Sequence, residues 1–141
     1  MSDTAAQTEQ PVHVAGRRSR AAAIAKRKDE WLDLFAEDAV VADPVGPSVF
    51  DPDGNGHRGR DAISAFYDKT IGAADTLEFV FTDTFICGNE EANIGTIVTT
   101  MGGYRVTTEG VFTYKVNAEG KLVALRAFWE MDRSARTARP I

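Results

Sequence analysis

The sequence predicts an α+β fold in which helices come first and a strongly curved antiparallel sheet follows. Residues 17–71 contain stretches whose apolar side chains recur at helical spacing, whereas residues 76–131 contain long β-branched or alternating segments. Helices followed by strands are typical of α+β proteins rather than of alternating βαβ proteins. Gly95 and Gly110 lie inside predicted strands, where kinks are tolerated. We therefore expect a strongly curved sheet whose concave face is covered by the N-terminal helices and which encloses a pocket.

The N-terminal elements follow in order. Residues 1–16 are small, polar and aperiodic, which predicts a disordered tail. Residues 17–28 are rich in Ala, Arg and Lys and predict a helix. Asp29 can cap a second, short helix whose apolar face includes Trp31 and Phe35.

A short strand and a third helix complete this half of the chain. The strand is predicted at residues 39–43, and a loop rich in Gly, Pro, Asp and Asn follows it. The helix is predicted at residues 60–71, with Phe66 and Tyr67 on its apolar face.

The remaining elements are strands, separated by Gly-rich or Asn-rich turns. They are predicted at residues 76–86, 91–101, 104–116 and 121–131. Residues 133–141 are small and basic and predict a C-terminal tail. The single domain is therefore expected to span residues 17–132.

Composition excludes several classes of function. Sixteen Lys and Arg against 21 Asp and Glu give a net charge of −5, which argues against a nucleic-acid partner. Cys87 is the only cysteine and there are two histidines, so we expect no disulfide framework and no metal site. The longest apolar runs are too short for a membrane span, and residues 1–16 have no apolar signal region. We therefore expect a cytoplasmic protein without a membrane partner.

Three motifs have a functional and a structural interpretation. The loop at residues 51–56 begins like an EF-hand, but Ala62 replaces the closing Glu, which favours an acidic surface loop. The pattern Gly54-x-Gly56-x-x-Gly59 lacks the parallel βαβ unit that dinucleotide binding requires. The basic cluster within residues 17–28 could bind an anion, but a solvated helix face is the favoured interpretation.

Asp43 is the strongest candidate for chemistry. It ends an apolar strand and precedes Pro44, which pushes the residue before it towards extended backbone. A carboxylate at the edge of an apolar pocket loses solvation, and this raises its pKa and strengthens it as a base. The structural alternative is that Asp43 caps the following turn.

Three segments carry a resemblance to a known family. Residues 31–46 (including Asp-Pro-Val-Gly), 59–67 and 117–128 resemble the bacterial ketosteroid isomerases of the nuclear transport factor 2-like (SnoaL-like) superfamily. The resemblance covers residues 17–132 in a consistent order. It implies a cone-shaped α+β fold around a deep apolar cavity, no cofactor, and a homodimer.

The resemblance also implies roles for individual residues. Asp43 falls on the general base that moves a proton next to a steroid carbonyl. Ser19 stands where these enzymes have an oxyanion-binding tyrosine, and Phe112 stands where they have a protonated aspartate. Tyr67 matches a supporting tyrosine and, with Ser19, is the expected substitute donor. Losing one such donor typically costs about 100- to 1000-fold in rate.

The expected ligand is a flat, hydrophobic, steroid-like small molecule. If the last strand follows the family, alternation turns one set of side chains towards the pocket. The expected ligand-binding residues are Trp31, Phe35, Phe66, Phe112, Leu125, Ala127 and Trp129. Ala127 also stands where limonene-type epoxide hydrolases have an aspartate, which argues against that mechanism.

We therefore expect a steroid isomerase-like enzyme in which Asp43 is the general base. One alternative is a non-catalytic binder of a hydrophobic small molecule on the same fold. Another is a SnoaL-like cyclase or hydratase that acts on a polyketide or terpenoid.

Overall fold

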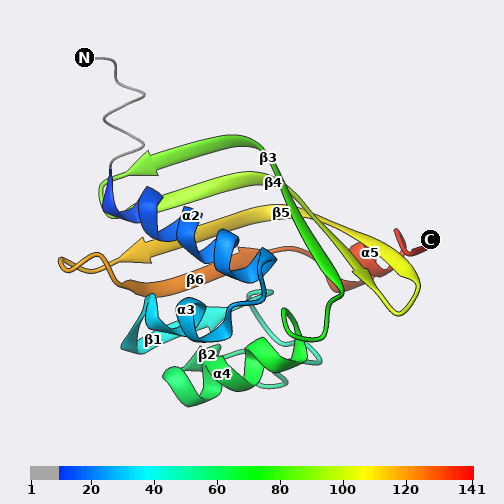
Figure 1. Ribbon diagram of the computed structural model, residues 1–141, viewed down its shortest axis with the longest axis horizontal. Coiled ribbons are helices and arrows are strands. Elements are labelled where there is room, and N and C mark those ends of the chain that lie inside the picture. The colour runs from blue at the N-terminus through cyan, green and yellow to red at the C-terminus, as the bar shows by residue number, and fades with distance from the viewer. Residues whose placement is uncertain (1–9) are drawn as a thin grey trace.

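The computed structural model describes residues 10–141, and Figure 1 shows their path. The elements are α2 (Pro11–Ile24), α3 (Lys28–Asp33), β1 (Phe35–Ala42), β2 (His57–Arg58), α4 (Arg60–Lys69), β3 (Thr76–Cys87), β4 (Glu90–Met101), β5 (Tyr104–Val116), β6 (Leu122–Phe128), α5 (Met131–Ala135) and β7 (Arg139–Pro140). The predicted α+β class, with the helices before the long strands, is confirmed. Among the described residues, no helix has the length and apolar character needed to cross a membrane.

The strands form one sheet in the order β2-β1-β6-β5-β4-β3, and β7 pairs with β5. All neighbours are antiparallel except β1 and β6, which run parallel with Val41 opposite Leu125. The expectation of a purely antiparallel sheet is therefore wrong in this one pairing. Between β1 and β6 the chain forms β2, α4 and the three long strands β3, β4 and β5. Strand β6 then lies beside β1 and runs in the same direction. A parallel pair requires such a long crossover, which local sequence patterns do not reveal.

Helix α2 begins at Pro11, six residues before the predicted start, and it ends at Ile24. The predicted disordered tail is therefore wrong for residues 11–16, and residues 1–9 lie outside the described part of the chain. Proline suits the first turn of a helix, because the missing N–H has no partner there anyway. Val12 and Ala15 are buried, so packing stabilises a segment that has weak helical periodicity.

Helix α2 lies across strands β3, β4 and β5, as Figure 1 shows. Gly16 makes this close approach possible. A Cβ atom at this position would lie 2.9 Å from Glu91 Oε2 and 3.1 Å from a ring carbon of Tyr114. Any larger side chain would push the helix away from the sheet.

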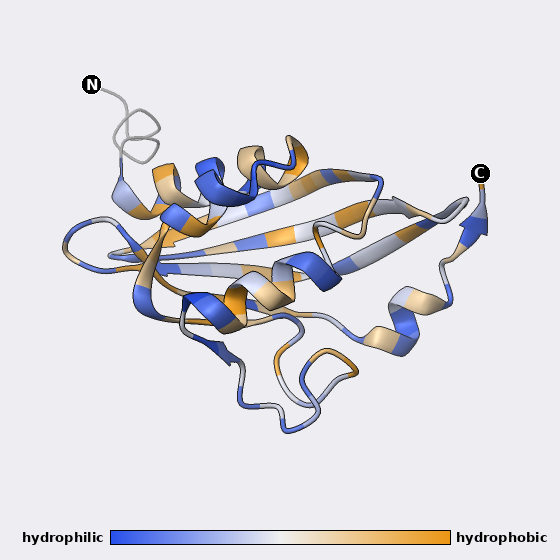
Figure 2. Cartoon of the chain, turned by 60° about the horizontal axis from the view of Figure 1, so that its bottom comes forward, coloured by the Kyte–Doolittle hydropathy of each residue, from blue (hydrophilic) through white to orange (hydrophobic). Residues whose placement is uncertain are grey.

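The hydrophobic core lies between the sheet and helices α2, α3 and α4. Its largest buried side chains include Trp31, Phe35, Ile63 and Leu122. Helix α4 is amphipathic, with hydrophobic and hydrophilic residues alternating along its turns in Figure 2. It contributes Ile63, Phe66 and Tyr67 to the core.

The C-terminal residues are ordered rather than a simple tail. Ser134 in α5 is buried, and its hydroxyl hydrogen-bonds that of Thr108 at 2.7 Å. Arg139 and Pro140 pair with the start of β5. The predicted tail at residues 133–141 is therefore part of the fold, held by side-chain contacts that its small and basic composition did not indicate.

Two glycines face each other across β4 and β5, where the strands pass close to their neighbours. Gly95 pairs with Gly110. A Cβ atom on Gly110 would lie 2.3 Å from the carbonyl oxygen of Phe128, and one on Gly95 would lie 2.3 Å from that of Val80. The sheet bends here because these positions have no side chain.

We predict that Gly110→Ala lowers the free energy of unfolding by about 1–3 kcal/mol, because the new methyl group must push backbone atoms apart. Denaturant unfolding measures the loss. Gly88→Asn is the control, since a Cβ at Gly88 meets nothing within 4 Å and Asn tolerates its φ of 62°. Equal stability of Gly110→Ala and the wild type would contradict this account of the bend.

Candidate active site

Asp43 follows β1 directly and lies beside the end of β6. The parallel pairing continues past the strands, since Val45 N donates to the carbonyl oxygen of Ala127 at 2.8 Å. Trp129, two residues further along, donates from its indole Nε1 to Asp43 Oδ1 at 2.5 Å. The structure thus brings together two residues that the sequence predicted for the same site.

The Asp43 carboxyl is partly buried, and its pKa is raised above the ordinary value. Loss of solvation is the main cause, and the hydrogen bond from Trp129 acts in the opposite direction by stabilising the charged form. A carboxylate with these properties is a stronger base than a solvated one. The indole also fixes the direction of one carboxylate oxygen.

An aromatic wall lies on the inner face of the sheet near this carboxyl. Phe112 and Ala127 are buried and stand opposite each other on β5 and β6. The Phe112 ring stacks on Phe81, with centroids 5.6 Å apart and planes at 22°. Phe81, from β3, was not among the predicted site residues. Its spacing of two residues from Phe79 and four from Leu77 places all three on one face of the strand.

The other predicted site residues form a separate layer around Trp31. Trp31 Nε1 donates to the hydroxyl oxygen of Ser19 at 3.2 Å. The Trp31 ring lies 5.4 Å from Tyr67 and 4.7 Å from Phe35. Phe66 also belongs to this cluster.

This layer is the hydrophobic core, and Leu125 packs against its edge. Among the described residues, no hydrogen bond joins Ser19 or Tyr67 to Asp43. Burial raises the pKa of Tyr67, so its phenol stays protonated.

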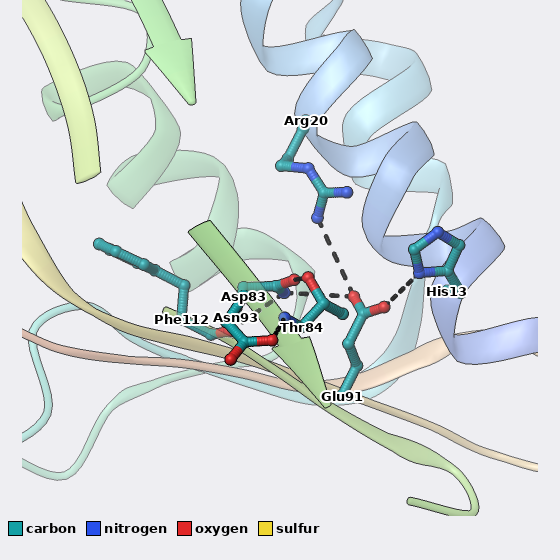
Figure 3. Close-up of polar contacts among 7 residues, drawn as sticks. All are labelled: His13, Arg20, Asp83, Thr84, Glu91, Asn93 and Phe112. Carbon is teal, nitrogen blue, oxygen red and sulfur yellow. Dashed lines mark hydrogen bonds and ion pairs between the residues drawn. The ribbon is translucent and has the colours of Figure 1, made fainter. Parts of the chain in front are cut away.

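A buried polar cluster between α2 and the sheet was not predicted. Glu91 is 1% exposed, and its two oxygens are hydrogen-bonded to His13 Nδ1 and, at 3.2 Å, to Asn93 Nδ2. Asn93 Oδ1 accepts a hydrogen bond from Thr84 at 2.7 Å. Figure 3 shows these contacts together with Arg20 above them. The cluster therefore places polar side chains between α2 and the sheet, in addition to the apolar residues that were expected there.

Arg20 points from α2 towards the sheet rather than into solvent. Its side chain is only 16% exposed, and its Nη1 is 4.0 Å from Glu91 Oε2, beyond hydrogen-bonding distance. The favoured interpretation of a solvated basic helix face holds for Arg17 and Arg18, which are exposed, but it is wrong for Arg20. A run of basic residues in a helix does not reveal which member faces inward.

Tyr114 links this cluster to Asp43. Its side chain is buried, and burial raises its pKa. Arg20 lowers that pKa through its positive charge and its polar contact with the phenol, whereas the negative charges of Glu91 and Asp43 raise it further. The signal for Tyr114 was present in the sequence, because it follows Phe112 by two residues on the same strand face.

The loop that resembles a calcium site is held by a hydrogen bond between two of its own residues. Asp51 Oδ2 accepts a hydrogen bond from Gly56 N at 2.7 Å. The following strand, β2, is antiparallel to β1, so the glycines of this loop are not part of a parallel βαβ unit.

A surface hollow of about 480 Å³ opens beside Trp129. Its lining includes Val45, Gly110, Val111 and Arg133. The volume falls within the range of small-molecule sites. The hollow adjoins the Trp129 indole that hydrogen-bonds to Asp43. The sequence had instead predicted an enclosed pocket, lined by side chains on the inner face of the sheet.

Comparison with known proteins gives the family. A model of the SnoaL-like domain matches residues 17–125. The chain is 29% identical over 96 residues to a steroid Δ-isomerase of Nocardioides simplex, which covers 68% of this chain and 71% of that protein. The chain therefore belongs to the SnoaL-like domain family.

Solved structures agree with this assignment. A crystal structure of Δ5-3-ketosteroid isomerase from Mycobacterium sp. superposes with a TM-score of 0.82 at 38% identity, covering 92% of this chain and 97% of that chain. The protein RV0760c of Mycobacterium tuberculosis, in complex with estradiol-17β-hemisuccinate, superposes with a TM-score of 0.82 at 33% identity, covering 93% and 99%. The protein is thus ketosteroid isomerase-like, and the predicted fold family is confirmed.

We predict that Asp43→Asn stabilises the fold at neutral pH but not at low pH. A carboxyl whose pKa is higher in the folded than in the unfolded state binds more protons when folded. Stability is therefore lost as the pH rises from the ordinary carboxyl value through the raised one. Asparagine removes this loss and retains an acceptor for Trp129.

Melting temperatures of the two proteins across this pH range measure the effect. The Asp43→Asn curve should lie above that of the wild type at neutral pH and meet it in acid. A variant that is less stable at neutral pH and equal in acid would show that the folded state favours the ionised carboxyl.

Proposed function

We propose that the protein binds a flat, steroid-like ketone and moves a proton next to its carbonyl group, with Asp43 as the general base. The observation that carries this proposal is the Asp43 carboxyl, which is desolvated and oriented by Trp129 at the edge of an aromatic wall. The protein has relatives that are named as steroid isomerases and one that is solved with a bound steroid, and this supports the choice of ligand.

The same carboxyl can carry out both halves of the reaction. As a carboxylate it takes a proton from the carbon next to the carbonyl, and as a carboxylic acid it returns the proton two carbons away. A raised pKa brings these two states closer in free energy at neutral pH, as general acid–base catalysis requires. No cofactor is needed for this step.

The proposed ligand contacts divide by position. Phe112, Ala127 and Trp129 are proposed to contact the ligand beside Asp43. The remaining predicted residues belong to the layer around Trp31, and we propose that this layer forms the inner end of the site. They are Ser19, Trp31, Phe35, Phe66, Tyr67 and Leu125. Tyr67 and Ser19 are the proposed donors there.

A second candidate is a non-catalytic binder of a hydrophobic ligand. The observation that favours it concerns the two positions where the isomerases have an oxyanion-binding tyrosine and a protonated aspartate: Phe112 has no donor, and Ser19 offers only an aliphatic hydroxyl, whose oxygen accepts from Trp31. Such a protein would bind a ketosteroid but leave it unchanged.

We further propose that two copies associate through the outer face of the sheet. Ile94, Val111 and Phe128 stand opposite one another on three adjacent strands, on the face away from Phe112. Ile94 is 41% exposed and Phe128 is 43% exposed. A second copy of the same face would cover this apolar surface.

The test compares the wild type with Asp43→Asn on a Δ5-3-ketosteroid, with the conjugated product followed by ultraviolet absorbance. We expect Asp43→Asn to lower kcat by about 100-fold or more, because the base is removed, while steroid binding stays within about threefold. Asp38→Asn is the matched control, since Asp38 lies on β1 but is exposed.

Turnover that is unchanged in Asp43→Asn would contradict the role of Asp43. Binding of the steroid to the wild type without turnover would support the non-catalytic binder instead.

A further inference from the structure

The two positions where the isomerases have an oxyanion-binding tyrosine and aspartate lie next to a largely buried arginine. Ser19 directly precedes Arg20 on α2, and Phe112 stacks on Phe81. The Arg20 guanidinium carbon lies over that same Phe81 ring, 5.1 Å from its centroid, and 5.7 Å from the centroid of Tyr114. A cation is therefore held at the wall where a neutral donor is missing.

Arg20 has donor capacity that the protein does not use. Its Nη1 is buried and has no hydrogen-bond partner. A buried donor without a partner costs free energy, so a native structure that retains one calls for an explanation. A ligand oxygen at this point would supply the missing acceptor.

The ion pair with Glu91 leaves this nitrogen of Arg20 without a hydrogen bond. The Glu91 oxygens are already hydrogen-bonded to His13 and Asn93, and Arg20 Nη1 stays 4.0 Å away from the nearer one. The aromatic rings of Phe81 and Tyr114 hold the guanidinium over their faces instead. Figure 3 shows Arg20 reaching down from α2 towards Glu91, with a dashed line marking their ion pair.

Titratable side chains face Arg20 from the sheet and from its own helix. Glu91 is on β4, Tyr114 is on β5, and His13 is on the same helix one turn before Gly16. Asp43 is close enough to Tyr114 for its charge to act there. The Arg20 cation lies over the Tyr114 ring, and the Asp43 charge raises the pKa of the same tyrosine.

We propose that Arg20 is the main oxyanion-binding residue of this protein, and that its guanidinium donates hydrogen bonds to the negative oxygen of an enolate or phenolate, as the tyrosine and aspartate replaced by Ser19 and Phe112 would do. This inference rests on the proposed function, since it concerns the same reaction at the same site.

The chemical step balances without any further reactant. A carboxylate oxygen of Asp43 takes the proton from the carbon next to the carbonyl, and the electron pair of that C–H bond forms a carbon–carbon double bond. The carbonyl π electrons move onto oxygen, where Arg20 N–H groups donate to the resulting enolate. Asp43 then returns the proton two carbons away as the carbonyl reforms. A charged donor in a desolvated site favours this negative oxygen more strongly than a neutral donor does.

The kinetic test uses Arg20→Met, which keeps much of the volume and removes the charge. We expect kcat on the Δ5-3-ketosteroid to fall by about 100- to 1000-fold while KM changes by less than about threefold. Arg20→Lys should recover part of the loss, because it restores the charge but not the planar fork. Arg18→Met is the matched control, since Arg18 lies on the same helix and is exposed.

A binding test gives a readout that does not depend on turnover. The probe is 2-nitroestradiol, a steroid phenol that ionises near neutral pH and whose phenolate absorbs visible light. With Arg20 present, the pKa of the bound phenol should be lower by about 1–3 units than in Arg20→Met. Arg18→Met should match the wild type, and melting temperatures confirm that each variant is folded.

The outcomes separate this inference from the proposed function. If Asp43→Asn abolishes turnover but Arg20→Met matches Arg18→Met in kcat and in phenol ionisation, the function stands and the role of Arg20 is overturned. If no variant turns over the ketosteroid but Arg20 still lowers the pKa of the bound phenol, the oxyanion site stands and isomerisation is overturned. A wild type that does not bind the phenol overturns the inference directly.

Discussion

The hydrogen bond from Trp129 to Asp43 is the interaction on which the candidate site depends. It joins the residues that follow two parallel strands, β1 and β6, and these strands are far apart in the sequence. The backbone contact from Val45 to Ala127 holds the same two chain segments together. Because the carboxyl is fixed at this junction, it is partly shielded from water and its direction is set by the sheet. The position of the Asp43 carboxyl is thus a consequence of how the sheet is ordered.

The interior of the protein contains a hydrogen-bonded polar cluster as well as the hydrophobic core. Glu91 is almost fully buried, and its hydrogen bonds to His13 and Asn93 offset part of the cost of removing a charge from water. The cluster depends on the close approach of α2 at Gly16. The same helix therefore closes the core with Val12 and carries a cation into the site with Arg20.

The sequence was sufficient to predict the long strands and the amphipathic helix, expected at residues 60–71 and observed at 60–69, because each has a strong local pattern. The role of Asp43 as a base is implied by the family resemblance and stays a prediction. Trp129 was predicted as a ligand contact, although its hydrogen bond to Asp43 was not. Asp43 could be singled out because a carboxylate at the end of an apolar strand is chemically unusual. The start of α2 could not be predicted, since burial of Val12 and Ala15 against the sheet overrides a weak helical pattern.

Arg20 and Tyr114 were missed for a different reason. Their importance comes from three strands and one helix meeting in space, and no local pattern records such a meeting. Tyr114 shares a strand face with Phe112, so alternation alone could have indicated it. Arg20 is indistinguishable in the sequence from its exposed neighbours Arg17 and Arg18. The parallel pairing of β1 and β6 is likewise a property of the complete chain.

The most direct measurement of the central claim is an NMR titration of the Asp43 side-chain carboxyl carbon in the wild type and in Trp129→Phe. We predict a midpoint above the ordinary aspartate value in the wild type, because burial disfavours the charged form. In Trp129→Phe the midpoint should move higher still, because the hydrogen bond that favours the carboxylate is lost. A wild-type midpoint at or below the ordinary value, or one that Trp129→Phe leaves in place, would contradict the account.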